Sequence, residues 1–300
     1  MTAGTIRRMT AHGRAPFVPL PDRPAWHWPN GAHLAVWVVI NVEHFEWNSM
    51  AGTGLASPAV QPPDVPNYTW REYGSRVGVW RTIDMLDRLQ IPASITLNAS
   101  VCDEYPQILR AFLEREWEIL GHGWTNSQGL SGLSEEDERR VISRTLERIT
   151  KDTGHRFRPR GWLGPGLAET HRTLEILAEH DIEYVADWVN DEQPYLLQTA
   201  TKPIVSIPYT LEMNDIGTFT RRGFTGPEYG EMLRDQFDVL YEESARTAKV
   251  MCVALHPFIT GVPARHKHLE AALAYMRRHQ HAWFTTGYEI VLAWRQATGN

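Results

Sequence analysis

Uninterrupted apolar runs alternate with amphipathic stretches along most of this chain. Residues 33–41 (HLAVWVVIN) are apolar almost throughout, which is typical of a strand buried on both faces. Between about 75 and 90, Val79, Ile83 and Leu86 recur at helical spacing, which predicts an amphipathic helix. Further strands are predicted near 94–98, 118–120, 183–187, 203–207, 250–255 and 283–286, and further helices near 105–117, 134–154, 169–179, 228–247, 265–278 and from 287 onward.

This alternation predicts parallel βαβ units. About seven strands within roughly 270 residues fit one closed barrel better than an open sheet with a second domain. The expected fold is therefore α/β, as a single irregular (β/α) barrel that spans residues 31–300. Residues 1–30 are rich in proline and arginine and are expected to form an extended surface arm without helix or strand. Residues 48–70 are expected to form a loop because of their composition.

Composition excludes several classes of partner. The formal net charge is −6 and the basic residues are scattered, so nucleic acid is not an expected partner. The longest clean apolar run, residues 34–40, is too short to cross a bilayer, so no membrane is expected either. The first residues lack the apolar segment of a signal peptide, and Cys102 and Cys252 are too few for a disulfide framework. We expect a cytoplasmic protein that acts on a small-molecule substrate.

Polar and aromatic residues recur directly after predicted strands. Catalytic groups of a parallel barrel gather at the carboxyl ends of its strands, so these residues are expected to share one mouth of the barrel. The residues in such positions are Asn41, Glu43, His122, Trp124, Asn126, Arg160, Trp162, Trp188 and His256.

Each of these residues also has a structural interpretation. Glu43 can be a solvated loop carboxylate, His122 a turn residue between two glycines, and His256 a buried structural histidine. Any one tryptophan fits the core better than a binding site. Four of them at four strand ends would suit the wall of a pocket for a flat ligand; they are Trp47, Trp124, Trp162 and Trp188.

Other catalytic motifs are incomplete. Gly164-Pro165-Gly166 lacks the third glycine of a dinucleotide-binding turn, and neither GxSxG nor HExxH occurs.

The order of these segments, over about residues 30–297, resembles the polysaccharide-deacetylase superfamily, which implies a deacetylase-type barrel. Sugar deacetylases of that family carry two acidic residues in a first motif, two histidine ligands four residues apart in a second, and a late Leu-His-Pro motif with the general acid. The acidic positions correspond here to Asn41 and Glu43, the histidine positions to His122 and Asn126, and the late histidine to His256. Two expected groups are therefore replaced by asparagine.

The altered pattern is similar to the allantoinase and cyclic imide hydrolase branch, which implies hydrolysis without a required metal. The run 72–81 (EYGSRVGVWR) is especially similar to that branch. So are Asn41-x-Glu43, His122-Gly123-Trp124 and the pairs Pro208-Tyr209 and Asn214-Asp215. His44, Asn126 and Ser127 differ from a true allantoinase, so the substrate stays open.

The predicted reaction is hydrolysis of a carbon–nitrogen bond in a small cyclic amide or imide. Either Glu43 or His122 would be the general base and His256 the acid that protonates the leaving nitrogen. Arg76, Arg160 and backbone amides of 161–164 would hold carbonyl oxygens. The further substrate contacts expected are Asn41, Trp124, Asn126, Trp162 and Trp188.

No cofactor is expected to be required. If a metal such as zinc binds, its ligands would be Glu43, His122 and Asn126. Two alternatives stay open: a metal-dependent N-deacetylase of an acetylated sugar, and a non-catalytic relative that only binds a ligand. The family resemblance also implies a homo-oligomer.

Overall fold

A long buried strand, β1, organises the sheet. The computed structural model describes residues 9–52 and 54–300. Within them the strands are β1 (Leu34–Val42), β2 (Ser94–Leu97), β3 (Glu118–Gly121), β4 (Gly161–Trp162), β5 (Tyr184–Val185), β6 (Tyr195–Leu197), β7 (Ile204–Ser206), β8 (Lys249–Leu255) and β9 (Ala282–Thr285). All nine residues of β1 are buried, as its apolar sequence predicts.

The strands form a curved, mostly parallel sheet in the order β6-β7-β5-β4-β3-β2-β1-β8, and among the named strands of the described residues only the β6–β7 pair is antiparallel. One edge of β1 pairs with β8 along 34–40, and its other edge pairs first with β9 and then with β2. Between β8 and the other end of the sheet, the described residues contribute only single contacts, such as the bridge from Asn214 to Ala254. The result is an incompletely closed, deacetylase-type (β/α) barrel, which confirms the expected fold class.

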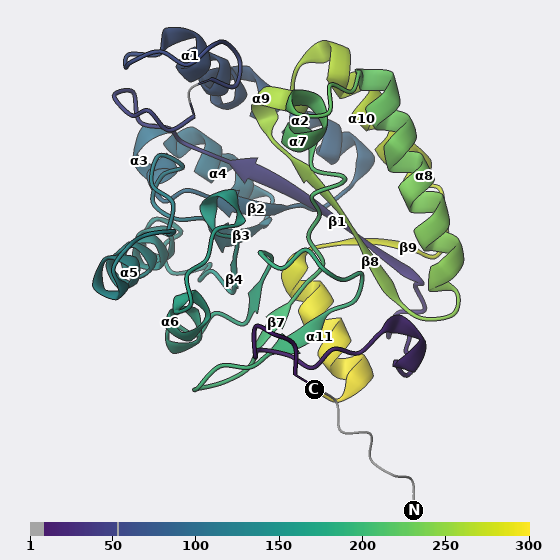
Figure 1. The fold of residues 1–300 in the computed structure, drawn as a ribbon. Coiled ribbons are helices and arrows are strands. Elements are labelled where there is room, and N and C mark those ends of the chain that lie inside the picture. Colours follow the sequence, from purple (N-terminus) through teal and green to yellow (C-terminus); the bar gives the residue numbers. More distant parts are fainter. Residues whose placement is uncertain (1–8, 53) are drawn as a thin grey trace, which may run out of the picture.

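Helices cover the outside of this sheet. Figure 1 shows β1 and β8 side by side through the middle of the molecule, with α8 and α10 on one flank and α5 and α6 on the other. The helices and helical turns are η1 (Leu20–Asp22), α1 (Val65–Tyr73), η2 (Gly74–Gly78), α2 (Val79–Leu89), α3 (Val101–Glu104), α4 (Pro106–Glu114), α5 (Glu135–Asp152), η3 (Pro165–Leu167), α6 (Thr173–Glu179), α7 (Asp215–Thr220), α8 (Gly226–Ser244), α9 (Pro257–Thr260), α10 (Pro263–Met276) and α11 (Gly287–Thr298).

The two faces of β1 serve two cores, because successive side chains of a strand point to opposite sides. Leu34, Val36, Val38 and Ile40 pack against the helices. Ala35, Trp37 and Val39 pack with Tyr184 and Val205 inside the barrel. Asn41 continues the inward series, so a polar group at the end of β1 points into the barrel.

The structure corrects several expected element bounds. The described residues contain nine strands rather than about seven, because β4 and β6 have two and three residues and are too short to show a periodicity. The helix α1 occupies part of the expected loop 48–70, and the side chain of Asp64 caps it by accepting from the Asn67 amide.

Residues 1–8 of the expected arm lie outside the described residues. The rest of the arm contains the 3-10 turn η1 and packs Trp28 into the core, so it is not purely an extended surface segment. Among residues 9–52 and 54–300, no helix has the length and apolar character needed to cross a bilayer.

Candidate active site

Glu43 lies between two histidines at the carboxyl ends of β1, β3 and β8. One carboxylate oxygen, Oε1, is 3.7 Å from Nε2 of His122 and 3.5 Å from Nε2 of His256. All three side chains are buried, with exposed fractions of 9% for Glu43, 3% for His122 and 6% for His256. Residues that are far apart in sequence are thus brought together, as the parallel barrel predicts.

The ring of His122 is held by the backbone. Its Nδ1 is 2.6 Å from the carbonyl oxygen of Leu163, which can only accept, so Nδ1 carries a hydrogen. In the neutral imidazole Nε2 then bears a lone pair, and this buried atom has no hydrogen-bond partner among the described residues. This lone pair faces Oε1 of Glu43, which lies 3.7 Å from Nε2, so a water molecule or a cation could interact with both atoms.

Two glycines allow His122 to reach this position. A Cβ on Gly121 would lie 2.6 Å from the ring of Trp162, and one on Gly123 would lie 2.8 Å from Pro165. Gly123 also has φ of +69°, in the left-handed region that favours glycine. The Gly-His-Gly sequence is therefore required by close packing as well as by the backbone turn.

His256 is oriented by Asp215, which lies at the start of α7. Nδ1 of His256 donates to Oδ1 of Asp215 at 2.7 Å, and the backbone N–H of His256 donates to Oδ2 at 2.8 Å. The hydroxyl of Thr260 donates to the same Oδ2 at 2.7 Å. Asp215 is fully buried, so His256 is fixed between two carboxylates, with Nδ1 on Asp215 and Nε2 toward Glu43.

The carboxylates and His256 stabilise each other's charged forms. Burial opposes ionisation of His256, but the charges of Glu43 and Asp215 outweigh it and raise the pKa of His256 to about 10. Burial would also raise the pKa of Glu43, but the charge of His256 outweighs this effect and lowers the pKa well below its usual range. At neutral pH the site therefore holds an ionised Glu43 and a protonated His256.

Two small cavities border Glu43, each of about 10 Å³. This volume is roughly that of one enclosed water molecule. Arg71 and Ser75 line both cavities. Ser75 lies in η2, a π-helical turn, and such turns are frequent at functional sites.

Asn41 is engaged in structural hydrogen bonds. Its Oδ1 accepts from the Thr96 hydroxyl at 2.8 Å, and its Nδ2 donates to the Tyr209 hydroxyl and the Leu255 carbonyl, each at 3.2 Å. These contacts join β1 to β2, β8 and the segment after β7. Both the oxygen and the nitrogen of the Asn41 side chain are thus engaged, which leaves no free group for the substrate contact predicted at this residue.

Asn126 lies near the site, but its side-chain oxygen already accepts a hydrogen bond within the protein. Oδ1 of Asn126 accepts from Nδ2 of Asn98 at 3.0 Å, and Asn98 also donates to the carbonyl of His122 and accepts from the His44 amide. Asn98 thus fixes both segments that carry the site.

Neither predicted arginine reaches Glu43. Arg76 is 71% exposed and pairs with Glu72 at 3.0 Å. Arg160 precedes β4 instead of following it, so it lies at the amino ends of the strands, where it pairs with Glu183. The prediction that Arg160 shares the pocket is therefore wrong: the two-residue strand β4 leaves Arg160 on its amino-terminal side.

The tryptophans do not form a common pocket wall. Trp162 is completely buried in the core. Trp124 is half-buried beneath Arg144, whose Cζ lies 4.1 Å from the ring centroid, and Trp188 is half-buried and donates to Glu169 at 3.1 Å. Trp47 is exposed and contacts the ring of Tyr68. None of the four lines the two cavities beside Glu43.

The residues do not fit a zinc site with three protein ligands. Glu43 and His122 offer two donors, but the oxygen of Asn126 is turned to Asn98. Within the described part of the chain, no group of three or more His, Cys, Asp or Glu side chains is placed to hold a metal ion. The predicted ligand set Glu43, His122 and Asn126 is therefore not assembled.

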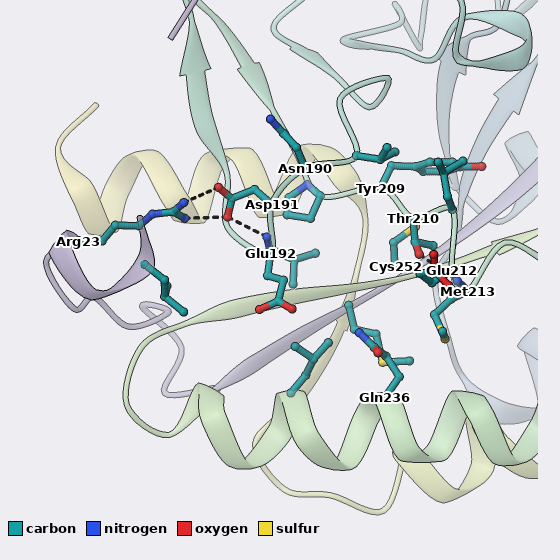
Figure 2. Close-up of a pocket in the computed structure, with 17 residues that line it drawn as sticks. Arg23, Asn190, Asp191, Glu192, Tyr209, Thr210, Glu212, Met213, Gln236 and Cys252 are labelled. Carbon is teal, nitrogen blue, oxygen red and sulfur yellow. Dashed lines mark hydrogen bonds and ion pairs between the residues drawn. The ribbon is translucent and has the colours of Figure 1, made fainter. Parts of the chain in front are cut away.

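A larger cavity, of about 490 Å³, lies beside β8 at the gap in the barrel. In Figure 2 the guanidinium of Arg23 is held at its edge by both oxygens of Asp191, at 2.7 Å each. Its lining includes Tyr209, whose hydroxyl contacts Asn41, but none of Glu43, His122 and His256. This cavity is therefore separate from the acid–base group.

The fold and the buried carboxylate with two histidines define a hydrolase of the deacetylase class, and comparisons with known proteins agree. A family model for polysaccharide deacetylase matches residues 69–185. The expected resemblance to this superfamily is thus confirmed over residues 69–185.

Individual relatives resemble nearly the whole chain. A Schizosaccharomyces pombe protein assigned as a polysaccharide deacetylase is 28% identical over 89% of this chain and 92% of its own length. A Pseudomonas aeruginosa PAO1 structure with the same assignment is 29% identical, with a TM-score of 0.82 over 97% of this chain and 98% of that chain. The structure of PuuE allantoinase is 28% identical, with a TM-score of 0.81 over 99% of this chain and 100% of that chain. The structural neighbours thus include the allantoinase branch that the sequence resembles.

Two site residues were not predicted from the sequence. Asp215 enters the sequence prediction only as part of the Asn214-Asp215 pair. Its position in the segment after β7 could also have predicted a site residue, as the position of Glu43 after β1 does. Arg71 gave no signal, because an arginine beside a glutamate in a polar helix is expected to face solvent.

Proposed function

We propose that this protein hydrolyses a carbon–nitrogen bond of a small cyclic amide or imide, with His122 as general base and His256 as general acid. The observation that carries the proposal is the arrangement on Glu43 Oε1: an imidazole with a free lone pair on one side, and a protonated imidazole on the other. A base and an acid within reach of one buried point are what addition of water and loss of an amine require.

The reaction proceeds in two steps. Water held between Glu43 and His122 adds to the carbonyl carbon while one of its protons passes to Nε2 of His122. The carbon–nitrogen bond then breaks, and the nitrogen takes the proton from Nε2 of His256. The products of a cyclic imide are a carboxylate and an amide on one chain.

Substrate size also favours a small ring. The cavities beside Glu43 have the volume of single water molecules, so the segments that cover them must separate to admit even a small ring. The similarity to PuuE allantoinase supports a cyclic amide in the same way.

The test uses purified, chelator-treated protein with hydantoin, allantoin, succinimide and dihydrouracil. We expect turnover of at least one of them, and Glu43→Gln and His256→Ala should each lower kcat about 10²–10⁴-fold. His171→Asn, a change at an exposed histidine, is the control and should keep wild-type activity. Retention of full activity in Glu43→Gln and His256→Ala would refute the assigned roles.

A metal-dependent N-deacetylase is the second candidate, because the family model and two of the relatives carry the deacetylase name. It predicts release of acetate from N-acetylglucosamine oligomers, loss of this activity with chelator and recovery with zinc. Elemental analysis of the untreated protein, together with both assays, separates the two candidates.

A further inference from the structure

Arg71 is a buried cation in the wall of the candidate site. It lies on α1 and only 9% of the residue is exposed. It lines both cavities that border Glu43 and a third small cavity next to them. The charge of Glu43 acts on its guanidinium, so the two groups are electrostatic neighbours.

At least one hydrogen-bond donor of Arg71 has no partner among the described residues. One terminal nitrogen, Nη1, donates to the carbonyls of Gly52 and Asn67. Nε is buried and has no partner among the described residues. A guanidinium has five N–H donors, so at least one donor of a buried cation is left for a group that the protein does not supply.

The surrounding segment is shaped around the guanidinium. Cζ of Arg71 lies 4.2 Å from the ring centroid of Phe45. Gly52 has φ of +83°, and a Cβ there would lie 2.9 Å from the same Cζ, so its backbone closes directly over the cation. This packing fixes Arg71 and excludes bulk water, which strengthens its interaction with any anion that enters.

The neighbouring carboxylates already have other partners. Asp64 accepts from the backbone and side chain of Asn67, and Glu43 lies between His122 and His256. No ion pair of Arg71 is found within residues 9–52 and 54–300. A buried arginine without a carboxylate, beside the acid–base group, suits an oxyanion of the substrate.

We propose that Arg71 is a further catalytic residue, which binds the oxygen of the attacked carbonyl and then the carboxylate that ring opening leaves there. This inference rests on the proposed function. As water adds and gives one proton to His122, the carbonyl oxygen gains the negative charge. As the carbon–nitrogen bond breaks, that charge returns to re-form the carbonyl, and the nitrogen leaves with the proton of His256. The proton that remains on the oxygen from water then passes to the neutral His256 and leaves a carboxylate, so atoms and charges balance without a further reactant.

The proposal predicts that the protein binds carboxylate ligands more tightly than neutral ones. The ring-opened product of a cyclic imide carries a carboxylate and should bind more tightly than a neutral molecule of the same shape. Succinamate and succinamide form such a pair, because they differ only in a carboxylate and an amide.

The test is calorimetric binding of succinamate and succinamide to the whole protein. For the wild type we expect at least about tenfold tighter binding of succinamate, a difference of about 1.4 kcal/mol. Arg71→Gln should remove the preference and lower kcat/KM for succinimide about 10²–10³-fold. Arg110→Gln makes the same change at an exposed arginine of α4 and should keep both values.

Equal binding of the two ligands by the wild type, or an unchanged preference in Arg71→Gln, overturns the inference. If Arg71→Gln does not fold, Arg71→Lys keeps the charge without the planar fork and should weaken the preference, while the wild-type comparison still decides by itself. Failure to turn over any cyclic amide, with Arg71-dependent binding of succinamate intact, would refute the proposed function and leave Arg71 as an anion-binding residue.

Discussion

At the scale of single residues, the candidate site depends on a carboxylate and a backbone carbonyl that hold two imidazoles in defined states. His256 donates from Nδ1 to Asp215, so its Nε2 can carry the proton that the leaving nitrogen needs. His122 donates from Nδ1 to a carbonyl, so its Nε2 can accept. Two chemically identical side chains therefore receive opposite roles from the group behind each ring.

Asp215→Asn tests this assignment. Loss of the Asp215 charge should lower the pKa of His256 from about 10, although Glu43 still raises it. Because only protonated His256 can act as an acid, the alkaline limb of the kcat/KM profile should move to lower pH. We expect kcat to fall about 10–100-fold, since part of the general acid contribution is lost.

The pH profile of kcat/KM for the best cyclic amide is the measurement. Asp235→Asn, at an exposed position of α8, is the control. An alkaline limb at the wild-type pH in Asp215→Asn would show that Asp215 does not set the protonation of His256.

At the scale of elements, the position of His256 depends on contact between two short helical pieces. A Cβ on Gly78, at the end of η2, would clash with the carbonyl of Pro257 at the start of α9. Gly261, at the end of α9, likewise has no room for a side chain against Gly78. The backbones therefore touch directly, which places η2 and its Ser75 beside the residue that follows His256.

Gly78→Ala should push α9 away and displace His256. We expect the free energy of unfolding to fall by about 1–3 kcal/mol, the usual cost of overpacking, and kcat to fall with it. Gly129→Ala is the matched control, because an added Cβ there meets no atom within 4 Å. Urea unfolding and the cyclic amide assay measure both effects, and wild-type stability in Gly78→Ala would contradict the close contact.

At the scale of the whole molecule, pH acts on stability through a pair of acids at the carboxyl ends of β4 and β5. Burial raises the pKa of Glu169 to about 7. Burial, and then the charge of Glu169, raise the pKa of Asp187 well above its usual range. The folded state therefore retains a proton that the unfolded chain has lost.

This proton makes folding less favourable as pH rises. Between the unfolded pKa of about 4.5 and the folded value of about 7, the folded state binds more protons, so the free energy of unfolding decreases with pH. Glu169→Gln keeps a neutral group and should be about 1–2 kcal/mol more stable than the wild type at pH 8, with little difference at pH 4.5. Urea unfolding at both pH values is the measurement, with Glu136→Gln on the exposed face of α5 as control. Parallel pH dependence of wild type and Glu169→Gln would contradict the proton that the folded state retains.

The sequence predicted the barrel and the meeting of Glu43, His122 and His256, because alternating strands and helices leave few topologies and strand ends converge in all of them. It did not predict the burial of Arg71, since helical periodicity cannot show which loop will fold over a polar face. Arg160 was misplaced because β4 is too short to show where it begins. The orientation of Asn126 depends on Asn98, a partner 28 residues away, which no local pattern reveals.

The carboxylate of Glu118 lies at the other rim of the barrel, where Ser94, Tyr184 and the amide of Tyr288 donate to it. Its partners tie together β2, β3, β5 and α11 without involving any group near Glu43. A hydrogen-bond network that joins four elements and the acid–base group thus lie at opposite rims. A directed-evolution library limited to 44–52 and 124–128 should alter ligand choice while the Glu118 rim preserves the scaffold that carries it.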